Sequence, residues 1–457
     1  MLVAMKFGGG ILSTAEDFKR VAEIVRKRRE KGEEIAIAVS AIKGMTDELI
    51  DAAKGAVKNS RGIDGFIRHA KESHSKALEG IKDTGIKEAA ANEIAVKIGL
   101  LEKALYGVSY LKELSPRSYD LLQTFGERIA IELLEAYLLD NGVNAKALEA
   151  DEAGMIVDSN YGRASPKMDE VERQMKQKVE PLLKTTVAII PGFYGVNKHN
   201  DIVCFGRGGT DYTAGIIAAA LDADHLELWK DVDGFMSADP KAVKNAKLIA
   251  QLSYDEAEEL GYFGAKIMHP RTVMPLRGKK IPIQARNVLK PEKIGTTICA
   301  EGKCDSEKVI KSIVSRKDIA MVSIKSAELI EGIGMIAKIF STIAEAGISV
   351  DMVSTSEAGI SLTVEKKNAQ KTRDVLAKEL DFEVEKIIIE DDIVLTSVIG
   401  HGMKGTPGIA GKLFSAMGKA GINIEVISQA SEINISFIIK EKNTEKAIAA
   451  IHREFME

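Results

Sequence analysis

The chain has 457 residues, too many for one hydrophobic core of ordinary size, so two or three domains are expected. Its 63 Lys and Arg residues nearly balance its 67 Asp and Glu residues, and no run of like charge suggests an arm that binds nucleic acid. No stretch of about 18 apolar residues predicts a membrane span. The composition therefore favours a small-molecule substrate over a nucleic-acid or membrane partner.

The cysteines and the first residues predict a cytoplasmic protein. Cys204, Cys299 and Cys304 are odd in number and lack the paired spacing of a zinc site, so free thiols in a reducing compartment are expected. The chain runs from Met1 into an apolar strand and a glycine run, without the charged and long apolar regions of a secretory signal.

Up to about residue 297 the sequence alternates short apolar runs with longer amphipathic stretches. This alternation predicts an α/β domain, residues 1–297, with a mostly parallel sheet and helices on both faces. Residues 48–112 have a helical period and few turn signals, so they are expected to form a helical excursion from the sheet. The clearest predicted strands span residues 35–39, 187–190, 225–229 and 281–285.

Residues able to contact a ligand come just past the ends of these four strands. Ligands of open α/β sheets bind at the carboxyl ends of the strands, so these residues are candidates to share one site. They are Ser40, Gly192, Phe193, Lys230, Asp231, Arg286 and Asn287.

Two glycine-rich segments suit an anion. Residues 6–10 (Lys-Phe-Gly-Gly-Gly) offer exposed backbone N–H groups and a mobile positive charge, although a simple tight turn would also explain them. Residues 206–212 (Gly-Arg-Gly-Gly-Thr-Asp-Tyr) precede an alanine-rich helix, whose N-terminus attracts anions. An N-capped helix explains Thr210 and Asp211 but not Arg207, whose planar fork matches a carboxylate.

Three further segments have ordinary structural explanations when each is taken alone. Residues 125–128 (Phe-Gly-Glu-Arg) fit a solvated helix start, and residues 229–234 (Trp-Lys-Asp-Val-Asp-Gly) fit a turn. Residues 263–272 (Phe-Gly-Ala-Lys-Ile-Met-His-Pro-Arg-Thr) fit a surface lysine beside a structural histidine.

An internal repeat appears past residue 303. Phe340 is echoed by Phe414 and Gly347 by Gly421, both at an offset of 74 residues. Each copy predicts a helix opened by glycine, a tight turn and a strand pair, which is the core of a small ferredoxin-like βαββαβ module.

As a set and in this order, residues 125–128, 206–211 and 263–270, followed by two such modules, resemble the aspartokinase family of the amino acid kinase superfamily. The resemblance covers nearly the whole chain. It implies ATP-dependent phosphorylation of the aspartate β-carboxylate, the first step of lysine, threonine and methionine biosynthesis. It also implies that residues 308–388 and 389–457 form two ACT domains.

The resemblance implies the residues of the site. The catalytic residues are Lys6, Lys266 and Asp211, and the substrate-binding residues are Ser40, Thr46, Glu127, Arg207, Gly208, Gly209 and Thr210. The ATP-binding residues are Lys6, Gly8, Gly9, Gly10, Lys230, Asp231, Met236, Lys241 and Lys266.

The chemistry agrees with these residues. An aspartate β-carboxylate is already ionised at neutral pH, so its attack on the γ-phosphoryl group needs no general base. Positioning and neutralisation of phosphate charge are needed instead, from lysines, backbone N–H groups and Mg²⁺ held mainly by the phosphates rather than by protein ligands. Glu127 suits the substrate ammonium and Arg207 its α-carboxylate.

The chain departs from the family pattern at several positions. The family usually has Thr or Ser, Ser and Val where this chain has Gly10, Ile11 and Leu12, and it usually has Thr at position 230. Met236 and Lys241 replace the usual Tyr and Arg. The alternatives are therefore a non-catalytic amino-acid-sensing subunit on a kinase fold and a kinase for another acyl substrate such as glutamate.

The first module is similar to the segment of lysine-sensitive aspartokinases, which implies lysine as a feedback effector. The implied effector residues are Asp351, Met352, Val353, Ser354, Ser356 and Glu357, although solvated turn residues would also explain the two acidic ones. ACT modules generally pair, so a homodimer or tetramer is expected.

Overall fold

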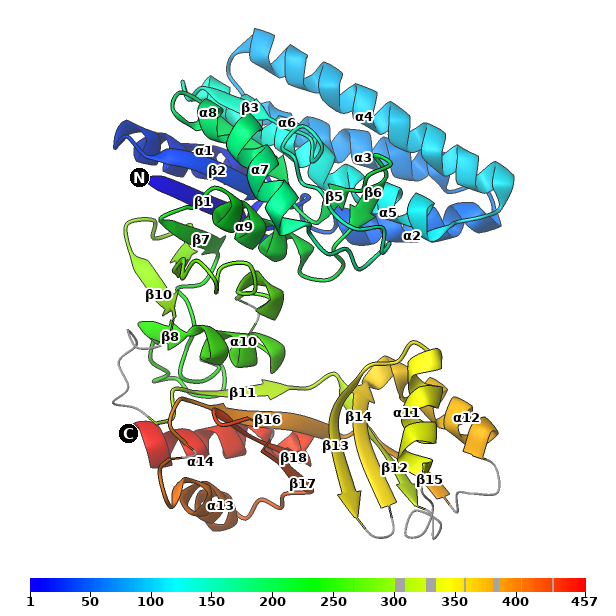
Figure 1. Ribbon diagram of the computed structural model, residues 1–457, viewed down its shortest axis with the longest axis vertical. Coiled ribbons are helices and arrows are strands. Elements are labelled where there is room, and N and C mark those ends of the chain that lie inside the picture. The colour runs from blue at the N-terminus through cyan, green and yellow to red at the C-terminus, as the bar shows by residue number, and fades with distance from the viewer. Residues whose placement is uncertain are drawn as a thin grey trace. The chain divides into compact units, whose positions relative to one another are not determined.

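The computed structural model describes residues 1–265, 267–300, 309–325, 334–356, 359–380, 386–403, 405–429 and 431–457. The chain divides into two compact units (Figure 1). Unit 1 consists of Met1–Phe235, Ala250–Glu258 and Lys266–Cys304. Unit 2 consists of Met236–Ile249, Glu259–Ala265 and Asp305–Glu457. In the described ranges, no helix has the length and apolar character that a bilayer crossing requires.

Unit 1 is built on an eight-stranded sheet. Every neighbouring pair of strands is parallel except β9 and β10, which are antiparallel. The predicted mostly parallel sheet is confirmed, and the four predicted strands correspond to β2, β4, β7 and β9. In spatial order the strands are β3 (Ala145–Ala147), β4 (Val187–Pro191), β2 (Glu34–Val39), β1 (Leu2–Phe7), β7 (His225–Lys230), β9 (Ile283–Asn287), β10 (Ile294–Cys299) and β8 (Gln251–Ser253). A separate hairpin pairs β5 (Tyr194–Val196) with β6 (Ile202–Cys204).

Helices surround this sheet, and residues 48–112 consist mainly of three of them, α2, α3 and α4, with their short connections. One of the sheet-covering helices, α1, begins with a capping box between Thr14 and Asp17 and buries an apolar stripe that includes Phe18 and Val25. The helices of unit 1 are α1 (Ala15–Glu30), α2 (Met45–Lys58), α3 (Ile63–Ala77), α4 (Thr84–Leu111), α5 (Pro116–Gln123), α6 (Phe125–Asp140), α7 (Met168–Lys178), α8 (Glu180–Leu183), α9 (Gly209–Ala220) and α10 (Tyr254–Tyr262), whose last turn belongs to unit 2.

The two faces of the sheet receive different side chains because successive residues of a strand point to opposite sides. In β1, Val3, Met5 and Phe7 join the large apolar core that α1, α4 and α6 also line. Lys6 points to the other face, where α9 packs against β1, β2 and β7. Strand alternation therefore places a lysine among apolar neighbours without inserting it into the main core.

Unit 2 contains two four-stranded antiparallel sheets. One has the order β13 (Val350–Ser356), β14 (Gly359–Glu365), β12 (Ile319–Lys325), β15 (Lys386–Glu390), with α11 (Met335–Glu345) and α12 (Ala369–Leu380). The other has the order β11 (Ser312–Arg316), β16 (Ile393–Ile399), β18 (Asn434–Lys440), β17 (Val426–Ser428), with α13 (Ile409–Lys419) and α14 (Thr444–Met456). The repeat seen in the sequence corresponds to α11 and α13, each preceded by a glycine in the left-handed region.

The two sheets do not follow the chain order. Strand β11 lies within the range expected for the first module, yet it pairs with β16 in the sheet of the second. Only Lys317 and Asp318 separate β11 from β12, so the chain crosses from one sheet to the other at this point. An apolar cluster that includes Ile319 and Leu395 joins the sheets, so neither module is independent of the other.

Candidate active site

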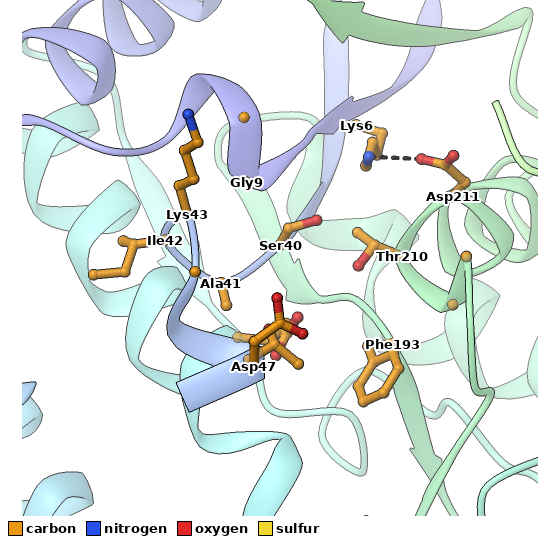
Figure 2. A pocket seen from close by; sticks show the side chains of 16 residues that line it. Lys6, Gly9, Ser40, Ala41, Ile42, Lys43, Asp47, Phe193, Thr210 and Asp211 are labelled. Atoms are coloured by element: carbon orange, nitrogen blue, oxygen red, sulfur yellow. Dashed lines mark ion pairs between the residues drawn. The ribbon is translucent and has the colours of Figure 1, made fainter. Parts of the chain in front are cut away.

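A cavity of about 360 Å³ lies in unit 1 at the carboxyl ends of β1 and β2, beside the first turns of α6 and α9 (Figure 2). This is the edge where ligands of open α/β sheets bind. Its lining residues are Lys6, Gly9, Gly10, Ser40, Ala41, Ile42, Lys43, Gly44, Thr46, Asp47, Glu127, Phe193, Gly208, Gly209, Thr210 and Asp211.

An ion pair crosses the inner end of the cavity. Nζ of Lys6 lies 2.6 Å from Oδ1 of Asp211, and the two side chains are 6% and 10% exposed. Burial opposes ionisation of Asp211, but the charges of Lys6 and Lys230 outweigh it and hold the pKa of this carboxyl below its usual value. Oδ2 of Asp211 also accepts the backbone N–H of His269 at 3.1 Å. The pair is therefore charged and fixed at neutral pH.

Lys230 adds a second cation on the same face of the sheet. It follows Leu228, the residue paired with Lys6, by two positions, so the two lysines point the same way. Burial and the nearby charge of Lys6 lower the pKa of Lys230 to about 8, against the attraction of Asp211. Two ammonium groups against one carboxylate leave a net positive charge, which suits a phosphate group.

Glycine is required at two positions of this cavity. A Cβ on Gly9 would lie 2.8 Å from the backbone oxygen of Ala41. Gly208, the residue before α9, has φ +74° and a Cβ there would lie 2.1 Å from the ring of His269. The backbone of both glycine segments consequently comes close to its neighbours, and the N-terminus of the 12-residue α9 opens toward the cavity.

Glu127 is a buried carboxyl in the first turn of α6, with 3% of the residue exposed. Burial raises the pKa of Glu127 to about 8, opposed by the backbone N–H of Ala41 and by Lys6. In the part of the chain that the structure describes, Oε2 of Glu127 has no hydrogen-bond partner. Because a buried unpaired oxygen is costly, this atom is suited to receive a donor from a ligand.

The structure brings together most of the residues that the sequence analysis singled out for this site. The cavity collects Lys6, Gly9, Gly10, Ser40, Thr46, Glu127, Gly208, Gly209, Thr210 and Asp211, and Gly8 lies directly under the Lys6 amine. Arg207 is exposed in the loop before α9, and its charge helps burial to lower the pKa of His269.

Of the other predicted ATP-binding residues, Asp231, Met236 and Lys241 do not line the described cavity. Asp231 is exposed after β7, and Lys266 lies outside the described residues. Met236 and Lys241 belong to unit 2. There the Met236 carbonyl accepts the Ser312 hydroxyl at 2.7 Å, and Ser237 Oγ lies 3.0 Å from Nε2 of His452.

Five lining residues were missed by sequence reasoning: Ala41, Ile42, Lys43, Gly44 and Asp47. Figure 2 shows Lys43 on the opposite side of the cavity from Lys6. The available signal was Lys43-Gly44, a lysine beside a glycine in the loop just past β2.

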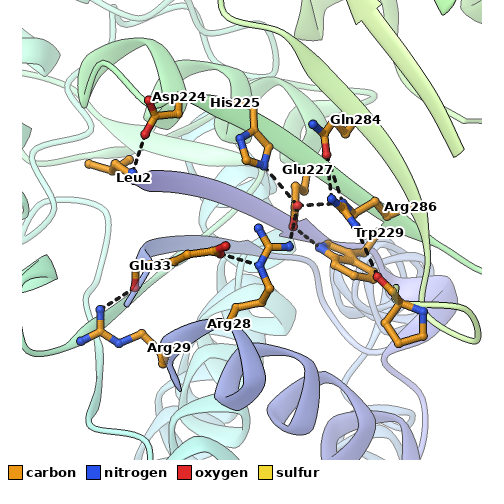
Figure 3. A network of polar contacts seen from close by, with 11 residues as sticks. Leu2, Arg28, Arg29, Glu33, Asp224, His225, Glu227, Trp229, Gln284 and Arg286 are labelled. Carbon is orange, nitrogen blue, oxygen red and sulfur yellow. Dashed lines mark hydrogen bonds and ion pairs between the residues drawn. The ribbon is translucent and has the colours of Figure 1, made fainter. Parts of the chain in front are cut away.

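Arg286 does not reach this site, so the expectation that it would share it is wrong. The register of β9 against β7 pairs Arg286 with Trp229, on the face opposite Lys6. There Arg286 joins a buried network around Glu227, which is 0% exposed (Figure 3). Oxygens of Glu227 lie 2.7 Å from Arg286 Nε, 2.8 Å from an Arg28 nitrogen and 3.1 Å from the Trp229 indole nitrogen.

The predicted effector segment lies in β13. Oδ1 of Asp351 accepts Arg316 at 3.0 Å and the Tyr262 hydroxyl at 3.1 Å, and its side chain is 8% exposed. Within the described ranges, Oδ2 of Asp351 is buried without a hydrogen-bond partner. Met352 packs into the apolar cluster between the sheets, while Val353 is 38% exposed. Ser354 is half-buried, Ser356 is exposed, and Glu357 lies outside the described residues.

Among the described residues, no group of three or more His, Cys, Asp or Glu side chains is arranged to hold a metal ion. Cys204 is a buried free thiol and Cys299 a partly buried one, while Cys304 lies outside the described ranges.

Comparison with known proteins agrees with this arrangement. A model described as the amino acid kinase family matches residues 1–287, and one described as the ACT domain matches residues 322–380 and 396–455. Aspartokinase 1, chloroplastic, of Arabidopsis thaliana is 33% identical over 99% of this chain and 80% of its own length.

Two solved structures of E. coli aspartokinase III share the fold over 100% of both chains. The complex with lysine and aspartate has a TM-score of 0.84 at 25% identity. The complex with aspartate and ADP has a TM-score of 0.83 at 24% identity.

The Glu227 network predicts a large loss of stability when its charge is removed. Glu227→Gln would leave two buried guanidinium groups without their shared counter-charge, so a loss of about 3 kcal/mol or more in the free energy of unfolding of unit 1 is expected. Chemical denaturation checks this, with Glu23→Gln as control, because its pair with Arg26 is exposed and should contribute less than about 1 kcal/mol. Similar small losses in both variants would contradict the assignment.

The raised pKa of Glu127 predicts a pH-dependent stability. A carboxyl whose pKa is higher in the folded protein than in the unfolded chain stabilises the fold at low pH, and this contribution is lost as the pH rises through about 8. Relative to Glu127→Gln, the wild type should lose on the order of 3–4 kcal/mol between pH 5 and pH 8 in the absence of ligands. The control is Glu16→Gln, at an exposed first-turn glutamate of α1. Parallel pH profiles of wild type and Glu127→Gln would disprove the raised pKa.

Proposed function

The chain belongs to the aspartokinase family and phosphorylates the β-carboxylate of aspartate, and on that premise we propose which of its residues perform the reaction. The observation that best supports this assignment of residues is the buried Lys6–Asp211 pair, which lies at the end of a cavity framed by two glycine segments. The chain is accordingly an aspartate kinase rather than a non-catalytic amino-acid sensor.

Aspartate would bind with its two ends held by opposite charges. Glu127, whose Oε2 points to no protein donor in the described part of the chain, would accept the substrate ammonium. Because the pKa of Glu127 is about 8 in the ligand-free site, this carboxyl is mostly protonated at pH 7 and would lose its proton when the ammonium binds. Arg207 would bind the α-carboxylate. The pocket would be completed by Ser40, Thr46 and the backbone N–H groups of Gly208, Gly209 and Thr210.

The phosphoryl group of ATP would lie against the two lysines of the sheet face. Lys6 and Lys230, with the backbone of Gly8, Gly9 and Gly10, are placed to neutralise phosphate charge. Asp211 would keep Lys6 oriented, and the ionised β-carboxylate of the substrate would attack without a general base. Lys266 is proposed to join the phosphates, and Asp231, Met236 and Lys241 to border the nucleotide.

Mg²⁺ fits this site as a companion of ATP. The carboxylates of Asp47 and Asp211 are the acidic groups of the lining apart from Glu127, and Asp211 is already paired with Lys6. The ion is therefore proposed to be held mainly by the phosphates, where it would supply charge neutralisation.

Lysine is the proposed feedback effector, with its ammonium on Asp351. Support comes from the buried Oδ2 of Asp351, which has no hydrogen-bond partner among the residues that the structure describes, since a buried carboxylate oxygen favours a cationic donor. The related E. coli aspartokinase III has been solved with lysine and aspartate. Met352, Val353, Ser354, Ser356 and Glu357 would complete the site. Self-association through the ACT modules is also proposed, because the sheets end in edge strands such as β15.

Removing the Lys6 charge should slow the chemical step more than it weakens substrate binding. Lys6→Ala is expected to lower kcat by about 100-fold to 1,000-fold, with the KM for aspartate within about threefold, because the charge acts on the transferring phosphoryl group. A coupled assay of ADP release measures both constants. Lys146→Ala, at an exposed lysine of β3, serves as the control. If Lys6→Ala raised only the KM for aspartate, Lys6 would belong to the aspartate side of the site rather than to the phosphate side.

The effector assignment predicts lysine inhibition that depends on Asp351. Coupling of about 1–3 kcal/mol between the two sites would give clear inhibition of the wild type by lysine. Asp351→Ala should raise the half-inhibitory lysine concentration by about tenfold or more, since a charge-assisted hydrogen bond is lost. The matched control is Glu425→Ala, the equivalent position of the second repeat, where the side chain is exposed. Inhibition by threonine alone, or lysine inhibition untouched by Asp351→Ala, would refute this assignment.

A further inference from the structure

A short connecting segment, residues 259–265, belongs to unit 2 although the residues before and after it in the sequence belong to unit 1. It contains the last turn of α10 and the Phe-Gly-Ala stretch that follows. The next stretch of unit 1 begins directly after this segment in the sequence.

Polar contacts hold this connecting segment to both ACT modules. The Tyr262 hydroxyl donates to Oδ1 of Asp351 at 3.1 Å, in β13 of the first sheet. The Asn434 side chain donates to Oε2 of Glu259 at 2.6 Å, from β18 of the second sheet. The segment thus has one side-chain anchor in each module.

Apolar and backbone contacts reinforce these anchors. Phe263 packs against the apolar cluster between the two sheets. Gly264 has φ +128°, and a Cβ there would lie 3.0 Å from the backbone oxygen of Ser315 in β11. A side chain would be strained at this φ, so the glycine at position 264 allows the backbone to approach β11 closely.

The chain that follows this segment leads to His269, which contacts Asp211 of the Lys6–Asp211 pair. Only three residues separate Ala265 from His269, and two of them, Ile267 and Met268, are buried. The backbone N–H of His269 donates to Asp211, and its ring lies against Gly208. The connection along the chain is therefore short.

The Tyr262 hydroxyl is a dependable donor in this arrangement. Tyr262 is 45% exposed, and its partial burial together with the neighbouring charge of Asp351 raises the pKa of its phenol to about 12, so the phenol keeps its proton throughout the physiological range. Arg316 shares the same oxygen of Asp351 at 3.0 Å and keeps the carboxylate in place.

We propose that Tyr262 is a positioning residue for phosphoryl transfer. Its hydrogen bond to Asp351 holds the start of the stretch that ends at His269. A displacement of His269 would loosen the hydrogen bond that keeps Asp211 beside Lys6. Tyr262 touches no substrate in this scheme and acts through the chain that follows it.

The same bond gives the proposed lysine effector a route to the active site, and this part rests on the proposed function. An ammonium at Oδ2 of Asp351 would share the carboxylate with Tyr262 and Arg316, which hold Oδ1, and would weaken their hold on it. An effector changes a conformational equilibrium only through contacts that differ between two states, and the Tyr262–Asp351 bond is one such contact.

The test compares two tyrosine variants that each lose one hydrogen bond to an aspartate. Tyr262→Phe removes the donor to Asp351, and the control Tyr106→Phe removes an exposed donor to Asp64, measured at 2.6 Å. Tyr262→Phe should lower kcat by about threefold to tenfold with the aspartate KM within about twofold, whereas Tyr106→Phe should match the wild type. Asp351→Ala, which removes the same bond from the other side, should reduce kcat similarly, and the double variant should be no worse than the more affected single variant.

Lysine binding, measured by calorimetry, separates this proposal from the effector assignment. If wild type neither binds lysine nor is inhibited by it, the effector assignment fails, but a kcat loss confined to Tyr262→Phe and Asp351→Ala still supports the positioning role. If lysine binds and inhibits, Tyr262→Phe should bind lysine and show weaker inhibition. Equal kcat in Tyr262→Phe and Tyr106→Phe, or additive losses in the double variant, would overturn the proposal.

Discussion

The charged pair of Lys6 and Asp211 is the interaction on which the active site depends. Both side chains are almost fully buried, and removing two charges from water is costly unless their geometry is good. That geometry requires β1 and the first turn of α9 to meet at one edge of the sheet, with His269 supplying a further hydrogen bond. A Cβ on Gly8 would lie 2.8 Å from the Lys6 amine, and one on Gly208 would meet the ring of His269, so the glycine loops leave room for the groups around the ion pair.

Buried charge is neutralised to different extents on the two faces of the sheet. On the face of α9, Lys6 and Lys230 outnumber Asp211, and the surplus positive charge is left for a ligand. On the opposite face, Glu227 is surrounded by Arg28, Arg286, His225 and Trp229 and has its hydrogen bonds within the protein. A satisfied network stabilises the fold, whereas an incompletely neutralised one is suited to the phosphate proposed to bind there.

Local patterns in the sequence were enough to predict the parallel sheet, the helical excursion and most of the cavity, because strand ends and glycine loops of one sheet converge by geometry. What could not be predicted depends on pairing between distant segments. Arg286 was misplaced because the register of β9 against β7 decides which face it takes, and a one-residue change would reverse it. Likewise β11 pairs with β16 across about 80 residues, a partnership that no local signal records. Lys43 and Asp47 were missed because one lysine beside one glycine is a weak signal by itself.

Glu127 and Asp351 share one physical feature, a buried carboxyl oxygen. Each is a buried carboxyl with one oxygen that finds no donor among the described residues, and each follows a turn into a helix or strand. A buried oxygen without a partner is tolerated at a cost that a ligand's ammonium can remove. The difference lies in the second oxygen's surroundings. At Asp351 the side chains of Tyr262 and Arg316 hold it, so a cation on the free oxygen would draw on the same charge as two side chains of the protein. At Glu127 the backbone N–H of Ala41 holds it, and this difference accords with the proposed substrate role of Glu127 and the proposed regulatory role of Asp351.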